Sequence, residues 1–293
     1  MKKFFTSLFF AVILSACATP TIGNNTITAA DKAKLTRIVA ARSDEDKARD
    51  AARNPQQTLE FFGITSDMAV AEVLPGGGWY TKILAPYLAE NGELHAVNYS
   101  HETWPLFGFF SEEQIAETKA SNLAFPETVA EFAGQTVKSS GMSFGRLNKN
   151  VEGTLDAILF IRALHNLQRF EASAGTMSQA LADTSKLLKT GGIVGVVQHM
   201  APENKSEEWA NGSRGYLKKS TIVALFDQAG FDLAGDSLVN VNPKDQPGEN
   251  DAVWRLPPSL NTGRLEGEAK EAAIATNTAI GETSRITLKF IKR

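Results

Sequence analysis

The sequence has only one cysteine, Cys17, in 293 residues, and charge of neither sign is in large excess, since the formal net charge is −3. A lone cysteine near the start leaves the rest of the chain without a thiol for a disulfide, a cysteine nucleophile or a thiolate metal site. We therefore predict no metal centre. The scattered basic residues and the small net charge also exclude the positive surface that a nucleic-acid partner requires.

Long apolar runs are missing as well. The apolar run at residues 4–14 follows two lysines and is shorter than the about 20 residues that a permanent transmembrane helix needs. Residues 14–17 read Leu-Ser-Ala-Cys, which resembles a bacterial lipobox. This pattern predicts a signal peptide over residues 1–16, lipidation of Cys17 and a tether over residues 17–30. The alternative is an ordinary signal peptide with a cysteine there by chance.

The expected location follows from the same segment. A lipidated Cys17 anchors an exported protein to the membrane on the periplasmic side. Ala18 after the cysteine resembles the enterobacterial sorting pattern for the outer membrane, which we therefore expect in preference to the inner membrane.

From about residue 31 onward, short apolar runs alternate with helical patterns, which is typical of an α/β domain. Strands are predicted at residues 68–74, 93–99, 137–144, 155–161, 193–198, 231–241 and 284–292. Helices are predicted at residues 31–53, 54–62, 79–89, 111–122, 171–188 and 220–228. The last strand is expected to run antiparallel, and residues 242–283 form a long insertion before it. We predict one Rossmann-like domain over residues 31–293.

A glycine-rich turn, formed by residues 75–78, joins the first predicted strand to the helix after it. Strand, glycine turn and helix together form a cradle for a phosphate or nucleotide, because glycine lets a ligand approach the backbone and the helix start offers free N–H groups. The pattern alone is common to dinucleotide enzymes and many other α/β folds. The alternative is that the glycines only make a tight turn.

Five sequence segments indicate which of these α/β families the chain resembles. In order along the chain they are EVLPGGGWYTKILAPYL (72–88), LDAILFIRALHN (155–166), LLKTGGIVGVVQH (187–199), NPKDQPGENDAVWRLPPSL (242–260) and SRITLKFIK (284–292). They resemble a bacterial family of class I S-adenosylmethionine-dependent methyltransferases over nearly the whole chain after residue 31. The resemblance implies a seven-stranded, mostly parallel sheet with helices on both faces, S-adenosylmethionine as the cofactor and a small-molecule substrate.

The resemblance also implies a cofactor site made of Glu72, Pro75, Gly76, Gly77, Gly78 and Asn98. Glu72 matches the family's acidic residue, and Gly76 and Gly78 match its second and third glycines. The chain departs from the pattern twice, with Leu74 in place of the first glycine and Asn98 in place of the carboxylate that binds the ribose. In the alternative interpretation, Glu72 pairs with a helix end and Asn98 is a loop residue.

The fourth predicted strand leads into Arg162, His165 and Asn166, at the sheet edge where open α/β folds place their ligands. These three are the candidate catalytic residues. His165 is expected to act as a general base on an O–H or N–H group, and Arg162 to hold a carboxylate. The alternatives are a helix cap for His165 and a surface ion pair for Arg162.

The expected function is therefore methyl transfer to a small molecule or an envelope component. The alternative is a non-catalytic envelope lipoprotein that binds a ligand with a degenerate methyltransferase fold. Leu74 and Asn98 favour that alternative, as does export away from the cytoplasm where S-adenosylmethionine is made, whereas Glu72, Gly76 and Gly78 favour catalysis. A nicotinamide oxidoreductase is less consistent with the sequence, because the second predicted strand lacks the usual acidic ribose contact.

Overall fold

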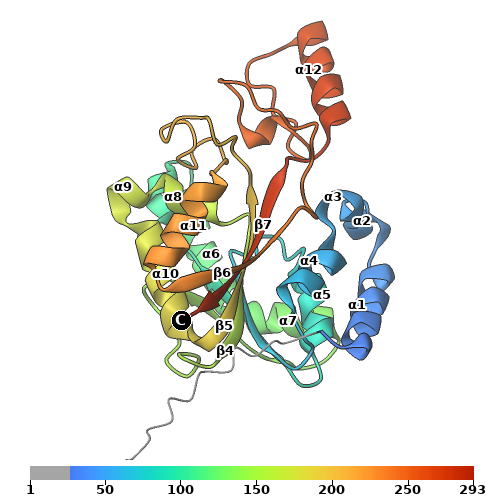
Figure 1. Ribbon diagram of the computed structural model, residues 1–293, viewed down its shortest axis with the longest axis vertical. Helices are drawn as coiled ribbons and strands as arrows, with labels where there is room; N and C mark the ends of the chain where they lie inside the picture. The colour runs from blue at the N-terminus through green and yellow to red at the C-terminus, as the bar shows by residue number, and fades with distance from the viewer. Residues whose placement is uncertain (1–26) are drawn as a thin grey trace, which may run out of the picture.

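The computed structural model describes residues 27–293, so the predicted signal peptide, Cys17 and most of the predicted tether lie outside the described residues. The fold is Rossmann-like, with one seven-stranded sheet in the order β3-β2-β1-β4-β5-β7-β6 (Figure 1). Its strands are β1 (Ala69–Val73), β2 (Glu93–Asn98), β3 (Lys138–Ser143), β4 (Leu155–Ile161), β5 (Leu188–His199), β6 (Phe231–Ser237) and β7 (Arg285–Lys292). Neighbouring strands are parallel except that β7 runs antiparallel to β5 and β6, which confirms the predicted reversed last strand.

The strand order determines where a ligand can enter. β1 lies between β2 and β4, and the chain moves outward from β1 on one side before it crosses to the other side. At this reversal the connections leave the sheet in opposite directions, which opens a crevice at the carboxyl ends of β1 and β4. All five residues of β1 are buried, as expected of a central strand covered on both faces.

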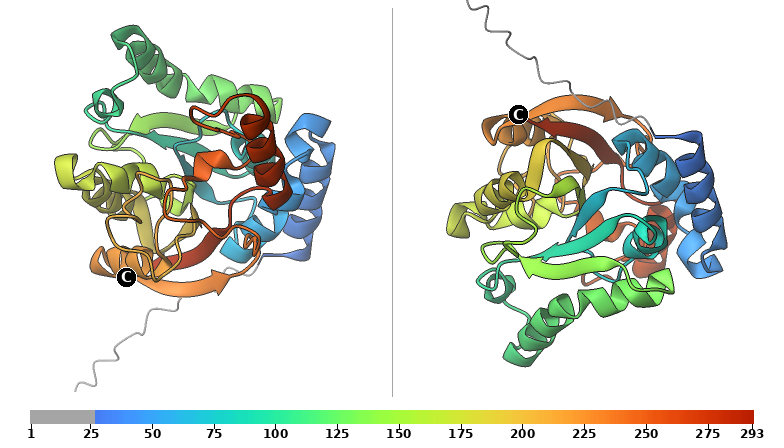
Figure 2. Two further views of the ribbon diagram at one scale, coloured as in Figure 1. Left: turned by 90° about the horizontal axis from the view of Figure 1, so that it is seen from above. Right: turned by 90° about the horizontal axis from the view of Figure 1, so that it is seen from below.

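Helices cover both faces of the sheet (Figure 2). On one face lie α1 (Ala29–Ala41), α4 (Pro55–Phe62), α5 (Thr81–Leu88) and α7 (Phe125–Ala133), which share a core with Val70 and Leu159. On the other lie α8 (Leu164–Arg169), α10 (Thr176–Leu187) and α11 (Lys219–Gln228), which share a core with Val73 and Phe160. No helix among residues 27–293 is both long enough and apolar enough to span a membrane.

The predicted helix over residues 31–53 is wrong, because three helices occupy this segment: α1, α2 (Asp44–Lys47) and α3 (Asp50–Arg53). Arg42 is extended, and the Ser43 hydroxyl accepts a hydrogen bond from the Asp46 amide at 3.2 Å. A serine that caps a new helix competes with continuation of the preceding one.

Three further boundaries differ from the prediction. Gly175, with φ +62°, splits the predicted helix at 171–188 into α9 (Glu171–Ala174) and α10. Residues 189–192, which the prediction left between a helix and a strand, lie inside β5, where the pairing with β4 shifts between Leu155 and Ala157. The sixth strand, β6, ends at Ser237, four residues before its predicted end at residue 241. The sequence analysis also missed α7, which directly follows α6 (Glu112–Leu123).

Residues 238–284 connect β6 to β7 and contain the 3-10 helix η2 (Val253–Arg255) and α12 (Gly267–Ile280). α12 has no buried residue and protrudes from the end of the molecule (Figure 1). The base of the insertion is fixed by the buried Asp245 carboxylate, which accepts hydrogen bonds from Thr283 Oγ1 at 2.7 Å, Ser284 N at 3.0 Å and Arg255 Nη2 at 2.8 Å. These charge-assisted contacts place η2 firmly over the body of the domain.

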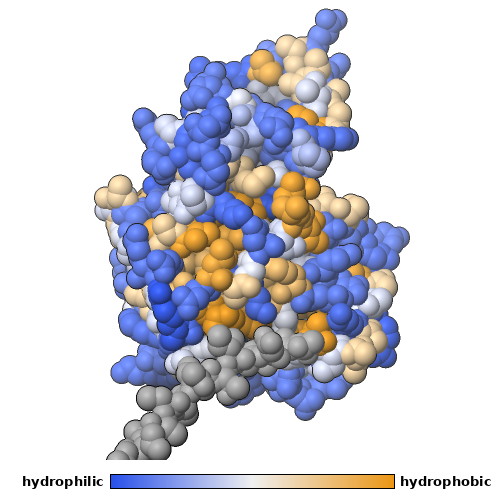
Figure 3. All heavy atoms as spheres, viewed as in Figure 1, coloured by the Kyte–Doolittle hydropathy of each residue, from blue (hydrophilic) through white to orange (hydrophobic). Residues whose placement is uncertain are grey.

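An apolar patch lies on one face of the molecule (Figure 3). In the view of Figure 1, apolar side chains gather over its middle, and hydrophilic side chains cover its flanks (Figure 3). β6 is an edge strand of the sheet, since it pairs only with β7, and it carries the exposed Leu233.

Candidate functional site

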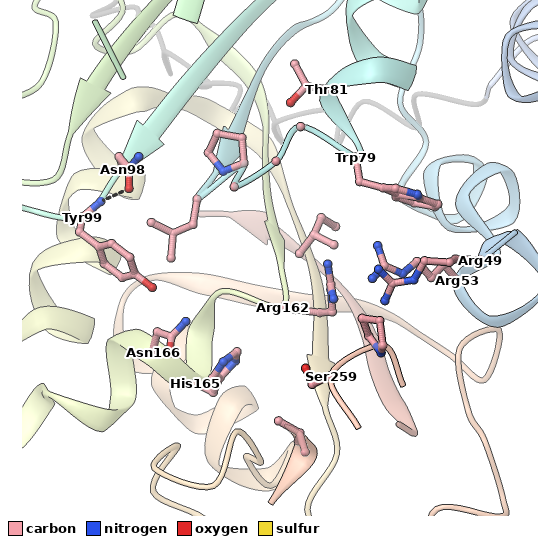
Figure 4. A pocket seen from close by; sticks show the side chains of 18 of the residues that line it. Arg49, Arg53, Trp79, Thr81, Asn98, Tyr99, Arg162, His165, Asn166 and Ser259 are labelled. Carbon is pink, nitrogen blue, oxygen red and sulfur yellow. Dashed lines mark hydrogen bonds between the residues drawn. The ribbon is translucent and has the colours of Figure 1, made fainter. Parts of the chain in front are cut away.

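A cavity of about 980 Å³ lies at the crevice between β1 and β4. It brings together eight of the nine site residues predicted from the sequence: Pro75, Gly76, Gly77, Gly78, Asn98, Arg162, His165 and Asn166 (Figure 4). Glu72 is the exception, because its side chain is buried beneath the turn and does not line the cavity.

The turn after β1 approaches the cavity with its backbone. Gly76 and Gly78 have φ values of +56° and +74°, and Leu74 has φ +53°, in the left-handed region that favours glycine. Leu74 thus adopts a backbone conformation that favours glycine, at a cost of about 1–2 kcal/mol. Its side chain lines the cavity.

The three glycines differ in what surrounds them. A Cβ atom added to Gly77 would meet no atom within 4 Å, and one added to Gly76 would meet only the Leu74 carbonyl at 4.0 Å. A Cβ atom at Gly78 would lie 3.1 Å from the Phe132 ring. Gly78 therefore packs against the protein, whereas Gly76 and Gly77 leave open space for a ligand.

The amide N–H groups of Gly76 and Gly77 have no hydrogen-bond acceptor within residues 27–293. They precede the start of α5, where the helix dipole adds a partial positive charge. Free donors at a helix start suit the carboxylate or hydroxyl oxygens of a bound molecule.

Glu72 acts on the cavity through another residue. Its Oε2 accepts a 2.6 Å hydrogen bond from Thr81 Oγ1, and Thr81 is the first residue of α5 and lines the cavity. Burial raises the pKa of Glu72 to about 7, against the opposing effects of this hydrogen bond and of the Arg162 charge. The geometry matches the alternative in which Glu72 holds a helix end, and it makes Glu72 a positioning residue.

Asn98 and two aromatic residues form the wall at the end of β2. The Asn98 Oδ1 accepts a hydrogen bond from its neighbour Tyr99 N at 2.9 Å, which leaves the amide NH2 group to donate to a ligand (Figure 4). Tyr99 and Trp104 line the cavity and pack edge to face with ring centroids 4.9 Å apart. Trp104 belongs to the 3-10 helix η1 (Trp104–Phe107). These rings, which we did not predict as site residues, offer an apolar surface for a flat ring.

Arg162 follows β4 directly and has φ +58°, so a second non-glycine residue in the left-handed region borders the cavity. Such strained residues cluster at functional sites because the surrounding structure must hold them in place. Burial and the charge of Arg285 lower the pKa of Arg162 to about 10, so its guanidinium remains cationic at neutral pH.

His165 is buried and neutral. Gln198 Nε2 donates to the Gly215 carbonyl at 2.8 Å, so Gln198 Oε1 is the acceptor that faces His165 Nδ1 at 3.3 Å. His165 Nδ1 therefore carries the proton, and Nε2 keeps a free lone pair. Burial, with the Arg162 charge, lowers the pKa of His165 to about 4. The His199 ring lies 5.2 Å away, and burial holds its pKa well below the ordinary value too.

Two arginines at the two ends of α3 complete the wall opposite Asn98 and Tyr99 (Figure 4), and the sequence analysis missed them. Arg49 Nε and Arg53 Nε lie 2.6 Å and 3.3 Å from the carboxylate oxygens of Glu282, next to β7. The Arg53 guanidinium stacks over the Trp79 ring at 4.7 Å, and Trp79 Nε1 donates to the Asp46 carbonyl at 3.1 Å. The residues that meet here are separated by more than two hundred positions, so no local pattern reveals the contact.

The insertion before β7 forms one wall of the cavity. Residues 253–254 and 256–259 line it, and the Trp254 ring lies 6.3 Å from the His165 ring. The position of Trp254 within the cavity favours a role at the site for this part of the insertion.

We predict that Glu72→Gln stabilises the protein increasingly as the pH rises. Because the folded-state pKa of about 7 exceeds the ordinary value of 4.5, the protonated form stabilises the fold below pH 4.5, and this contribution is lost as the pH rises through 7. The stability difference between variant and parent should therefore change by up to about 1.4 kcal/mol per pH unit between these limits.

Thermal unfolding followed by circular dichroism from pH 5 to pH 8 measures this difference. Glu127→Gln, at an exposed position on α7, is the matched control for the loss of a carboxylate. A flat difference for Glu72→Gln would show that this carboxyl is ionised throughout.

Comparisons with known proteins give similarity at the level of structure only. Neither protein-family models nor curated protein sequences match the chain. Similar solved structures include a SAM-dependent methyltransferase from Aquifex aeolicus, with a TM-score of 0.45 and 15% identity over 70% of this chain and 93% of that chain. They also include geranyl diphosphate C-methyltransferase from Streptomyces coelicolor, in complex with S-adenosyl-L-homocysteine, with a TM-score of 0.48 and 11% identity over 88% of each chain.

A third similar structure is the [4+2]-cyclase SpnF, with a TM-score of 0.47 and 15% identity over 89% of this chain and 93% of that chain. At these identities, neither an activity nor a ligand transfers from such structures to this protein. Its function has to be argued from its own site.

Proposed function

We propose that the protein is an S-adenosylmethionine-dependent methyltransferase that acts on a small molecule or an envelope component. The observation that carries the proposal is the left-handed turn of residues 74–78, which opens to a cavity at the point where the strand order reverses. The resemblance of the sequence segments to class I methyltransferases independently supports the same cofactor.

The residues around the turn fit the chemical groups of this cofactor. Tyr99, Trp104 and Leu74 offer apolar surface for the purine, and the Asn98 amide is positioned to donate to a ribose hydroxyl. The free N–H groups of Gly76 and Gly77 suit the carboxylate of the methionyl part. When bound, S-adenosylmethionine supplies a methyl group on a sulfonium, which is an electrophile that needs no metal.

The protein's contribution to methyl transfer is mainly placement of the acceptor next to the donor, since orientation of two reactants can account for about 7–11 kcal/mol of the barrier. The free Nε2 lone pair of His165 accepts a hydrogen bond from the acceptor's O–H or N–H group. A histidine with a pKa of about 4 is a weak base, so we assign its main role to alignment of the acceptor. This assignment modifies the general-base role expected from the sequence.

The cofactor assignment predicts that the purified protein binds S-adenosylhomocysteine in isothermal calorimetry. Gly77→Val should weaken this binding at least about tenfold, because the added side chain occupies the space where the ligand approaches and meets no protein atom. Gly248→Ala is the control, since a Cβ atom there makes only ordinary contacts in an exposed loop.

If neither S-adenosylhomocysteine nor S-adenosylmethionine binds at millimolar concentration, the methyltransferase proposal is wrong. Binding without any methyl transfer to envelope extracts or small acceptors would instead favour the non-catalytic ligand-binding protein.

The protonation state of His165 is predicted separately. In nitrogen-15 NMR spectra, its imidazole should remain the Nδ1–H tautomer without titration between pH 8 and pH 5, because burial and Arg162 disfavour the cation. The spectrum of His165→Asn assigns the signal among the four histidines of the chain. A titration midpoint near 6.5 for that signal would contradict the assigned role.

The proposed location rests on residues 1–18, outside the described residues. We propose an exported lipoprotein, anchored through Cys17 and facing the periplasm, in the outer membrane. Cys17→Ser should release the protein from the membrane fraction or leave its precursor uncleaved. The proposal fails if this variant fractionates and migrates like the parent, and separation of inner from outer membranes decides between the two membranes.

A further inference from the structure

Three arginines pair with a single carboxylate that lines the cavity, and a fourth adds its charge to the same group. The carboxylate of Glu282 lies within ion-pair distance of Arg49, Arg53 and Arg285. The guanidinium of Arg162 adds to the same electrostatic group, since it interacts with both Arg53 and Arg285. The other acidic groups facing Arg162 are Glu72, whose raised pKa leaves it partly neutral at pH 7, and the neutral phenol of Tyr80. Positive charge therefore exceeds negative charge at this wall.

Three of these side chains line the cavity, and we refer to Arg49, Arg53 and Arg162 as the arginine cluster. Arg49 Nη2 and Arg53 Nη2 are buried without a hydrogen-bond partner among the described residues, and Arg53 is only 4% exposed. A buried guanidinium with unused donors carries a desolvation cost that a protein normally offsets with an anion.

The cluster is also held in place before any ligand arrives. Arg53 stacks on Trp79, on the opposite wall from Asn98 and Tyr99 (Figure 4), and Glu282 fixes the Nε ends of both Arg49 and Arg53. Their free Nη groups are thus preorganised donors, and a guanidinium presents its donors in a planar fork that matches carboxylate and phosphate oxygens.

We propose that the arginine cluster binds an anionic group of the methyl acceptor, either a carboxylate or a phosphate. The acceptor is therefore an organic acid or a phosphate ester. The identification of the bound anion as part of a methyl acceptor rests on the proposed methyltransferase function. The anion site itself does not depend on that function.

The charge of the donor supports the acceptor as the source of the anion. S-adenosylmethionine has a sulfonium and an ammonium group against one carboxylate, so it brings a net positive charge to a wall that is already cationic. The three guanidiniums of the arginine cluster carry three positive charges, and Glu282 balances only one of them. The single carboxylate of S-adenosylmethionine does not neutralise the rest. An anionic second ligand restores the balance and gains charge-assisted hydrogen bonds.

The test uses inorganic phosphate and succinate as probes, titrated into the purified protein with and without saturating S-adenosylhomocysteine. We expect both anions to bind in calorimetry and to raise the melting temperature, at constant ionic strength held with chloride. We expect phosphate to bind equally well in the presence of S-adenosylhomocysteine. Arg53→Gln and Arg162→Gln should each lower phosphate affinity at least about tenfold, whereas the exposed Arg37→Gln should not change it.

Both variants should fold, because each removes a charge from a group of like charges. Glu282 keeps Arg49 and Arg285 as partners in Arg53→Gln, and Arg162 has no ion-pair partner to lose within residues 27–293. We expect both variants to give cooperative melting without phosphate and circular dichroism spectra like that of the parent, although Arg53→Gln loses its stacking on Trp79.

Three results would overturn the proposal: no binding of either anion, binding that Arg53→Gln and Arg162→Gln leave intact, or competition between phosphate and S-adenosylhomocysteine. Competition would assign the cluster to the carboxylate of the donor. Phosphate binding through these arginines in a protein that never binds S-adenosylhomocysteine would overturn the methyltransferase function but support the anion site.

Discussion

The site depends on one backbone constraint. The residues directly after two adjacent parallel strands, β1 and β4, both adopt the left-handed conformation at the same edge of the sheet. Leu74 follows β1 and Arg162 follows β4, with φ values of +53° and +58°. Each amide first extends the sheet, through hydrogen bonds from Leu74 N to Val97 O and from Arg162 N to Val197 O. The chain then turns away, and the crevice opens between the two turns. The buried sheet tolerates the strain, on the order of 1–2 kcal/mol for each residue.

The second organising contact is Glu282, because it joins parts of the chain that are remote in sequence. It pairs with Arg49 and Arg53 from the short N-terminal helices and with Arg285 at the start of β7. Arg285 also donates to the Ala52 carbonyl at 2.6 Å. These contacts place the N-terminal helices against the base of the insertion and thereby form the cationic wall of the cavity.

The parts of this structure that could be predicted from sequence are those with a local cause. β1 and β4 followed from continuous apolar runs, β2 and β7 followed from alternating patterns, and the turn of residues 75–78 followed from its glycines. The break after α1 was missed because the Ser43 cap has no stronger signal than the helix formers around it. The arginine cluster was missed because it depends on the tertiary contact with Glu282. The partner of Glu72, Thr81, was not identified because their hydrogen bond lies below the turn.

The cationic wall and the neutral histidine are connected by electrostatics. The pKa of His165 is low mainly because the ring is buried, and the charges of Arg162 and Arg169 lower it further. If the arginine cluster binds an anion as we propose, that anion offsets part of this positive charge and raises the pKa of His165. The lone pair at Nε2 then becomes more basic only when an anionic acceptor occupies the cavity. By linkage, protonation of His165 favours anion binding to the same extent, so acceptor recognition and proton affinity at this site reinforce each other.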